Sequence, residues 1–346
     1  MSRPSLIGAL GIGKQSAKDS VASTIVYAPA TSVGLNMSQN VQALPAEVGG
    51  SYFLRGSYKP SVSGGGDTAM VVRPSTLTYL LYALCGQDTV TAVPAQAGAF
   101  QHVYTPFTPA AGVDLPWMTL IKDAAKLYAE QYLNTKLQSL RLDVPKSSLV
   151  TAQASWFATT PSSVTSASLG AEVFDTTQPF VTCNAVISLT PQGSGSNISA
   201  NSIKMERYGM TFGNNISNDE FSVGSFYPDD VTLLQRTAMV DMDLIVRDTA
   251  LYQAVYLNGN SIPASWSPTI YRGSFTITLT STQMIPSTTQ PYQLIINFPG
   301  LDFMTLPISI VGANLVRATL STQVTLGPSG SDMYTLTLIN GTGSSY

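Results

Sequence analysis

The chain has 346 residues, with 17 Lys or Arg, 20 Asp or Glu and a single His, so its formal net charge is −3. Charged residues make up 11% of the chain, against roughly 25% in ordinary soluble domains, and a surface so poor in charge is better suited to burial between subunits than to a free life in solution. The chain has no run of Lys or Arg to grip a phosphate backbone and no stretch of roughly 18 consecutive apolar residues, which excludes tight nucleic-acid binding and a membrane helix.

Residues 1–45 are rich in Gly, Ala, Ser and Gln without a sustained hydrophobic period, and we expect them to form an extended N-terminal assembly arm. Within this arm, residues 8–15 match the G-x4-G-K part of a phosphate-binding loop. Gln15 stands where the Mg²⁺-binding Ser or Thr should be, and the strand that should feed the loop is missing, which favours a flexible Gly-rich arm. Lys14 and Lys18 interrupt the apolar stretch, so we expect no secretory signal and synthesis in the cytoplasm.

Residues 46–160 are predicted to form a β domain with one helix. Ser75 is the expected N-cap of this helix and Gly86 its C-terminal stop, with an apolar stripe between them at i, i+3, i+4 and i+7. Alternating apolar residues at 140–144 and 150–156, separated by a Pro-Lys-Ser-Ser turn, predict a hairpin with one buried face. Residues 122–133 stay open between helix and strand, because two charges have helical spacing while the neighbouring segments are strands.

A stretch dominated by Thr, Ser and Ala is the predicted linker, at residues 161–174, and the pattern then starts again in a second domain at 175–346. A helix is expected over 248–257, with Leu251, Ala254 and Val255 on one face. Alternation or β-rich composition predicts strands near 181–189, 203–212, 241–244, 275–279, 323–326 and 334–338.

The two halves echo each other in sequence. Residues 34–41 follow a pattern that begins with Gly and ends with Asn and a β-branched residue, and the same pattern returns at 209–216. The predicted helix at 75–86 matches 248–259 in the same order and at nearly the same separation. Repetition on this scale predicts a chain that supplies two similar units to an assembly.

No residue constellation predicts catalysis, a cofactor or a metal. His102 has no second His, acidic motif or Cys spacing near it in the sequence, so a hydrogen-bonded His on a strand is expected. The acidic pairs Asp229-Asp230 and Asp241-x-Asp243 lack the ligand number and the Gly of an oxygen-rich cation loop, and solvated carboxylates are the expectation. Of the two cysteines, Cys85 lies on the apolar helix, where a buried free thiol is expected.

The order of these features resembles the tail tube (major tail) proteins of long-tailed bacteriophages, over nearly the whole chain. The likeness is carried by residues 11–16, by Arg73-Pro74-Ser75 before the first helix, and by the segments at 102–106, 137–142 and 209–218. The resemblance implies β-sandwich or half-barrel domains, each with one flanking helix, that close into rings of six domains and stack into a hollow tube without an active site. The predicted fold class is therefore mainly β, with two such tandem domains.

Since each chain carries two units, three chains are expected to make one pseudo-hexameric ring. The implied partners are further copies of the chain, the tape measure, tail tip and terminator proteins, and DNA in transit, and the implied location is the virion tail. Asp241 and Asp243 are candidates to face the lumen, because they alternate with the apolar Met242 and Leu244. Two alternatives remain at this point: a virion decoration or fimbria-like β-protein, and a carbohydrate-active β-sandwich enzyme.

Overall fold

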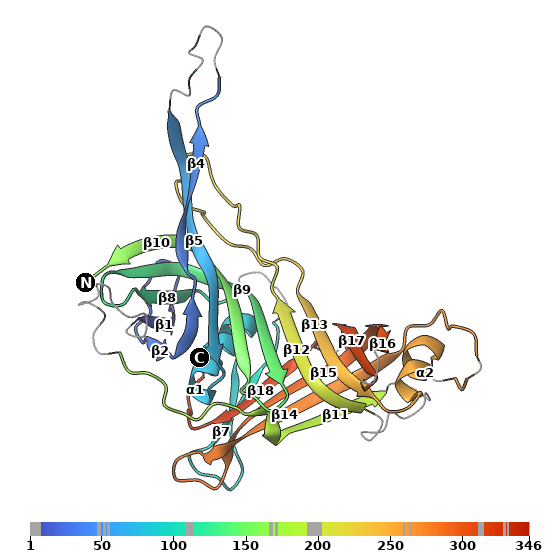
Figure 1. Cartoon of the computed structure of the whole chain (residues 1–346). Helices are drawn as coiled ribbons and strands as arrows, with labels where there is room; N and C mark the ends of the chain where they lie inside the picture. The colour runs from blue at the N-terminus through green and yellow to red at the C-terminus, as the bar shows by residue number, and fades with distance from the viewer. Residues whose placement is uncertain are drawn as a thin grey trace.

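The computed structural model of the chain describes residues 8–46, 50, 53, 56–107, 114–165, 169, 172–191, 203–258, 260–262, 264–310, 315–327, 330 and 332–345 (Figure 1). Strands dominate, so the predicted mainly β fold class is confirmed. The strands are β1 (Ala9–Lys14), β2 (Val26–Ala28), β3 (Ala30–Val33), β4 (Asn36–Ala43), β5 (Ser57–Val71), β6 (Thr89–Ala92), β7 (Phe100–Tyr104), β8 (Met118–Asp123), β9 (Ala129–Pro145), β10 (Thr151–Val164), β11 (Ala185–Pro191), β12 (Ile203–Gly213), β13 (Thr237–Val246), β14 (Arg272–Met284), β15 (Pro291–Thr305), β16 (Ile308–Ser309), β17 (Arg317–Val324) and β18 (Thr335–Asn340); the helices are α1 (Pro74–Cys85) and α2 (Ala250–Leu257).

The antiparallel strand pairings follow one order twice along the chain. In the first half, neighbouring strands run β1, β8, β9, β10 and β5, with β3 and β4 on the outer side of β5. In the second half they run β11, β14, β15, β17 and β13, with β12 on the outer side of β13. The helix follows the equivalent strand in both halves, since β5 leads into α1 and β13 into α2.

The register of the two halves also corresponds. The backbone N–H of Gly34 donates to the carbonyl of Asp67 at 2.8 Å, and Gly209 is the cross-strand partner of Asp241. The two glycines of the sequence repeat therefore sit at the same place, each opposite an aspartate on the strand that leads into the helix.

Two strand pairs join the halves. β9 pairs along its C-terminal part with β12, and β7 pairs with β18. Most buried apolar side chains of both halves belong to one cluster, which runs in sequence from Leu10 to Ile339; a smaller one contains Phe107, Leu115, Ile216 and Val231. The two sets of strands therefore share one sheet and one core, and β10 extends through the first four residues of the predicted linker.

The described residues of the expected N-terminal arm form strands. β1 lies between β2 and β8, and Leu10 and Ile12 are fully buried. The sequence did not predict this strand, because Gly11 and Gly13 have no side chains to continue the apolar alternation. Glycine is required at position 13, since a Cβ there would come within 2.4 Å of the carbonyl oxygen of Thr24. The two glycines therefore allow residues 22–27 to pack directly against the backbone of β1, as glycine does where another backbone approaches closely.

Helix α1 forms as its apolar spacing predicts, with Gly86 in the left-handed conformation at its C-terminus. The predicted N-cap is wrong: the helix begins at Pro74, one residue before Ser75, and the preceding Arg73 makes no side-chain cap. The carboxylate of Asp175 instead accepts the backbone N–H of Thr76 at 2.9 Å and its hydroxyl at 2.8 Å. This cap comes from about 100 residues away in the sequence, so no local pattern could reveal it.

The open segment at 122–133 is strand and turn. β8 ends at Asp123 and β9 begins at Ala129, and the ion pair of Lys122 with Glu130, at 3.1 Å, joins these two strands. The helical spacing of Lys126 and Glu130 was therefore misleading: Lys126 lies in the turn and pairs with Asp123 and Glu172, whereas Glu130 pairs with Lys122.

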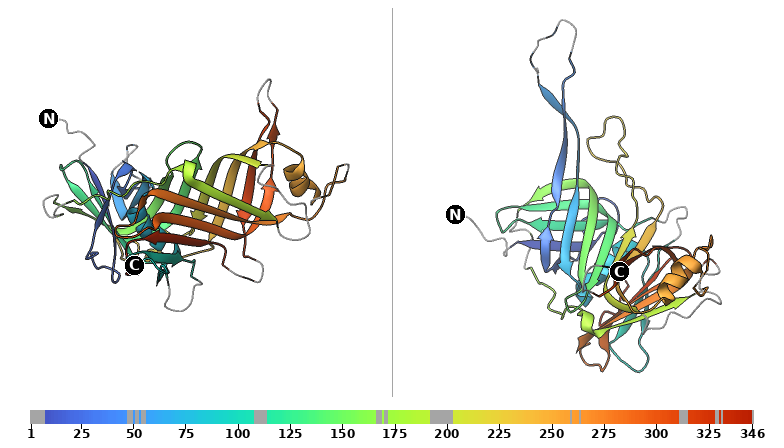
Figure 2. Two further views of the ribbon diagram at one scale, coloured as in Figure 1. Left: turned by 90° about the horizontal axis from the view of Figure 1, so that it is seen from below. Right: turned by 45° about the vertical axis from the view of Figure 1, so that its right-hand side comes forward.

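Figures 1 and 2 show β4 and β5 projecting from the body as a long hairpin, with the connection between β12 and β13 rising beside its base. The N–H of Val62 donates to the carbonyl of Phe226 in that connection at 3.0 Å, and the Lys59 ammonium lies 5.4 Å from the centre of the Phe226 ring. The two projecting segments are thus in contact. None of the described helices is long and apolar enough to cross a membrane.

Candidate functional site: the polar face of the sheet

A single sheet crosses the junction of the two halves in the order β5, β10, β9, β12, β13 and β17. Side chains alternate along each strand, so one side of this sheet contacts the apolar core and the other does not. We call the second side the polar face. Its residues include Asp67, Ser139, Arg141, Asp143, Gln153, Ser155, Arg207, Gly209, Thr211, Asp241, Asp243, Thr319 and Ser321.

An arginine crosses the junction between the halves. Arg141 on β9 holds both oxygens of Asp143, at 3.0 and 3.2 Å, and its other terminal nitrogen donates to Thr211 on β12 at 3.0 Å. This path is open because residue 209 lacks a side chain: a Cβ on Gly209 would come within 2.4 Å of the Arg141 guanidinium. Gly209, the glycine of the repeat, thus leaves the space through which Arg141 reaches Thr211 on the polar face.

A second arginine continues the row of charges onto β13. Arg207 donates to Asp143 at 2.6 Å and lies 3.6 Å from a carboxylate oxygen of Asp243, whose other oxygen accepts the Thr319 hydroxyl at 2.9 Å. Partial burial raises the pKa of Asp143, but the hydrogen bonds from Arg141 and Arg207 outweigh it and lower the pKa below its usual range. Cations and carboxylates therefore alternate and neutralise one another across the junction.

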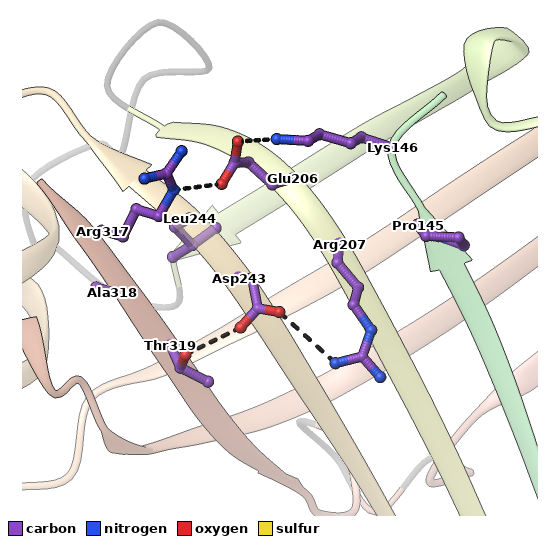
Figure 3. Close-up of a pocket in the computed structure, with 9 residues that line it drawn as sticks. All are labelled: Pro145, Lys146, Glu206, Arg207, Asp243, Leu244, Arg317, Ala318 and Thr319. Carbon is purple, nitrogen blue, oxygen red and sulfur yellow. Dashed lines mark hydrogen bonds and ion pairs between the residues drawn. The ribbon is translucent and has the colours of Figure 1, made fainter. Parts of the chain in front are cut away.

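The upper edge of this face carries a further group of charges, which line a shallow pocket with the row just described (Figure 3). Glu206 on β12 accepts a hydrogen bond from the Arg317 guanidinium at 2.8 Å and contacts the Lys146 ammonium. Hydrogen bonds from Arg317 and Lys146 lower the pKa of Glu206 to about 2. This carboxylate stays ionised at neutral pH, and its two cationic neighbours are already paired.

The two candidate lumen residues lie together on this face. Asp241 and Asp243 are on β13, half-buried, and alternate with the buried Val240, Met242 and Leu244. The acidic pair Asp229-Asp230 is elsewhere, in the connection between β12 and β13, where Asp229 accepts the Ser222 N–H at 2.8 Å and Asp230 lies 4.0 Å from Lys136.

The other sequence signals have structural roles. His102 is buried on β7, with Nδ1 at 3.0 Å from Asp88 and Nε2 at 2.8 Å from the carbonyl of Thr342. Residues 9–14 of the loop-like motif are the paired strand β1, so they do not form a phosphate-binding loop. The described part of the chain contains no group of three or more His, Cys, Asp or Glu placed to hold a metal ion.

The sequence did not reveal the contribution of β12 to this face. Glu206, Arg207 and Gly209 lie on a strand that was predicted, but their partners are on β9, β13 and β17. The repeat motif marked Gly209 as notable, and the alternation of Arg141 and Asp143 marked a solvent-facing side of β9. Neither signal identifies the strand that lies alongside.

A family model described as phage tail tube protein matches residues 7–334, which is nearly the whole chain. No curated protein matches the chain.

Proposed function

The chain belongs to the phage tail tube protein family, and we propose that three copies of it close into a ring of six similar units, which stacks into the hollow tube that delivers DNA. Membership makes the protein a structural component of the phage tail, and it confirms the resemblance seen in the sequence. The number of chains in a ring and the passage of DNA are the parts that we propose.

The repeated order of strand pairing carries this proposal. The strands β1, β8, β9, β10 and β5 correspond to β11, β14, β15, β17 and β13. In each half the helix comes directly after the equivalent strand, α1 after β5 and α2 after β13. A chain with two equivalent units needs only three copies to present six units around a closed axis. We therefore propose two tail-tube-like units per chain. The first joins the predicted domain at 46–160 with strands β1, β3 and β4 of the expected arm, and the second is the predicted domain at 175–346.

We propose that the polar face lines the lumen. Its arginines are held by carboxylates, and Asp67 and Asp241 add negative charge at equivalent positions of the two halves. A lining of this kind offers few unpaired cations to the phosphates of DNA. Few counterions are then released from the DNA, so the lining binds DNA weakly. The opposite side of the sheet is buried in the core and is unable to face DNA.

The proposed partners are further copies of the chain along and around the tube, together with the tape measure, tail tip and terminator proteins of the same tail. The virion tail is the corresponding location, after synthesis in the host cytoplasm. The low charge content supports a protein that is assembled with other subunits rather than a free monomer.

Electron microscopy of the purified protein tests the proposal. We expect rings or tubes, and a reconstruction with three chains and six similar lobes per ring. The mass of a single ring, measured by light scattering or native mass spectrometry, should be three times the chain mass of 36.7 kDa. Rings of six chains would contradict the stoichiometry, and a protein that stays monomeric under all assembly conditions would contradict the proposed tube.

A further inference from the structure

The junction inside the chain has a counterpart at the chain's outer end. On β9, Leu142 pairs with Ala152, which pairs in turn with Met70 on β5. In the second half, Ile308 pairs with Ala318, which pairs in turn with Leu244 on β13. Since β17 and β13 are the equivalents of β10 and β5, Ile308 occupies the position of Leu142 and Ile310 that of Val144.

These equivalent residues differ in one respect. Leu142 and Val144 are 0% and 2% exposed, because β12 pairs alongside them on β9. Ile308 and Ile310 are 37% and 81% exposed, and among the described residues β16 pairs only with β17. The second half therefore presents, at its outer edge, apolar side chains that the first half covers with a strand.

The missing strand has an equivalent elsewhere in the chain. β12 covers β9 in the first half and lies on the outer side of β13; β3 and β4 lie in the same way on the outer side of β5. In the described part of the chain, β3 and β4 pair with no strand other than β5. One end of the chain thus has an edge with no strand beside it, where the Tyr256 hydroxyl bonds the N–H and the carbonyl of Leu306. The other end has the strand that fits that edge, where the Leu35 carbonyl accepts the Lys122 ammonium at 2.6 Å; a strand paired there would replace these side-chain bonds.

We propose that the β3–β4 segment of one copy pairs antiparallel with the edge formed by residues 304–310 of a second copy, so that the chain-to-chain junction repeats the β9–β12 junction. This inference rests on the proposed ring and names the contact that closes it. A head-to-tail contact between two different surfaces generates a ring when the rotation closes. An unpaired strand edge is the surface on which another chain adds most readily.

The equivalence also fixes the register. Within the chain, Gly213 pairs with Ser139, Met210 with Leu142 and Tyr208 with Val144. The corresponding pairs between two copies are Ser38 with Thr305, Leu35 with Ile308, and Val33 with Ile310. The last two pairs put Val33 of β3 and Leu35, which lies between β3 and β4, beside the exposed isoleucines, as Met210 and Tyr208 lie beside Leu142 and Val144.

A cysteine cross-link tests this register. Ser38→Cys and Thr305→Cys, both at exposed sites, are combined in a Cys183→Ser background, which removes the exposed native thiol. Directly opposed residues of an antiparallel pair have Cβ atoms about 4.5–5.5 Å apart, close to the spacing of a disulfide. We expect mild oxidation to give covalent dimers and trimers that reduction dissolves.

The matched control shifts one cysteine along the same strand. Ser38→Cys with Ser309→Cys displaces one thiol by four residues, about 13 Å along the strand, which is too far for a disulfide. We expect at least a tenfold lower yield of covalent species. Equal yields for both pairs, or a higher yield for the shifted pair, would overturn the proposed register.

Microscopy of the same samples separates this inference from the proposed function. Rings or tubes that never cross-link through Ser38 and Thr305 would overturn the contact and leave the tube intact. Cross-linked chains that never form a closed ring would support the contact and contradict the tube. Loss of both the cross-link and the assembly would overturn both.

A charge at the apolar edge provides a second test that leaves the fold in place. Ile310→Lys puts an ammonium at a site that is 81% exposed in the single chain, so we expect unfolding to be unchanged and ring formation to fall at least tenfold. Ile270→Lys is the control, since Ile270 is also more than half exposed but lies outside the edge. Normal assembly of the Ile310→Lys protein would count against the contact.

Discussion

The guanidinium of Arg141 lies across Gly209, in the space that any side chain at position 209 would need. We expect Gly209→Ala to push the guanidinium away from Asp143 and Thr211 and to cost about 1 kcal/mol of unfolding free energy, since the pair is partly exposed. Denaturant unfolding measures this loss. In an Arg141→Ala background the same Gly209→Ala change should cost clearly less, and equal costs in both backgrounds would show that the arginine is not the cause.

The sequence alone predicted the elements whose signals are local. Helix α1 follows from its leucine spacing and Gly86, and the β9–β10 hairpin follows from the alternation on both sides of its turn. The start of α1 was misplaced because its cap, Asp175, comes from a distant segment. β1 was missed because Gly11 and Gly13 remove the side chains that would show alternation.

The candidate site was predictable only in part, because the partners of its residues come from segments far apart in the sequence. Asp241 and Asp243 alternate with core residues, which indicates a polar side of a strand, but alternation does not say which strand lies next to it. The partners of Asp243 are Arg207, 36 positions before it, and Thr319, 76 positions after it. Charge pairing across a sheet depends on strand order and register, and those are set by the packing of the whole chain.

The buried contact of His102 with Asp88 predicts a pH-dependent stability. Burial lowers the pKa of His102, but the hydrogen bonds to Asp88 and to the Thr342 carbonyl outweigh it and raise the pKa above its usual value. A raised pKa in the folded state means that the contribution to stability is complete below the unfolded value of about 6.5 and is lost as the pH rises through the folded value.

We therefore expect His102→Gln to destabilise the protein by about 2 kcal/mol at pH 5.5, the range of a hydrogen bond to a charged group, and by less at pH 9. Denaturant unfolding of both proteins at the two pH values gives the difference directly. A cost that does not change between these pH values would mean that His102 is neutral in the folded protein throughout.

Lys136 is expected to hold the connection between β12 and β13 in place. Its side chain is fully buried, its ammonium contacts Asp114 and the carbonyl of Val231, and it lies 4.0 Å from the centre of the Trp117 ring. Lys136→Met keeps much of the volume but removes the donor and leaves the buried carbonyl of Val231 without it, whereas the Asp114 carboxylate is half-exposed, so we expect a cost of about 2 kcal/mol.

Limited proteolysis provides the local readout for this change. We expect faster cleavage within residues 217–231 of the Lys136→Met protein, because the segment loses its contact with β9. Lys204→Met serves as the control, since Lys204 is an exposed residue of β12, where a substitution usually changes the unfolding free energy by no more than about 0.5 kcal/mol. Unchanged cleavage of the segment after Lys136→Met would show that other contacts hold it.

The proposed lumen predicts how added positive charge acts on DNA. Asp241 lies on the polar face opposite Gly209, at the position equivalent to Asp67 in the first half. Asp241→Lys raises the charge of each chain by two, so a ring of three chains gains three ammonium groups and loses three carboxylates on the proposed inner surface, a net change of +6. We expect assembled tubes of this variant to retain DNA at salt concentrations that release it from the unchanged tube, with a steeper dependence of binding on salt.

The control for this experiment makes the same charge change outside the polar face. Asp332→Lys alters an exposed residue in the connection between β17 and β18, so its tubes carry the same net charge as those of Asp241→Lys. If net charge alone attracted DNA, both variants would retain it equally. Retention by the Asp241→Lys tubes alone, protected from added nuclease because the DNA lies inside, would place Asp241 at the lumen, whereas nuclease-sensitive binding would place it on the outer wall.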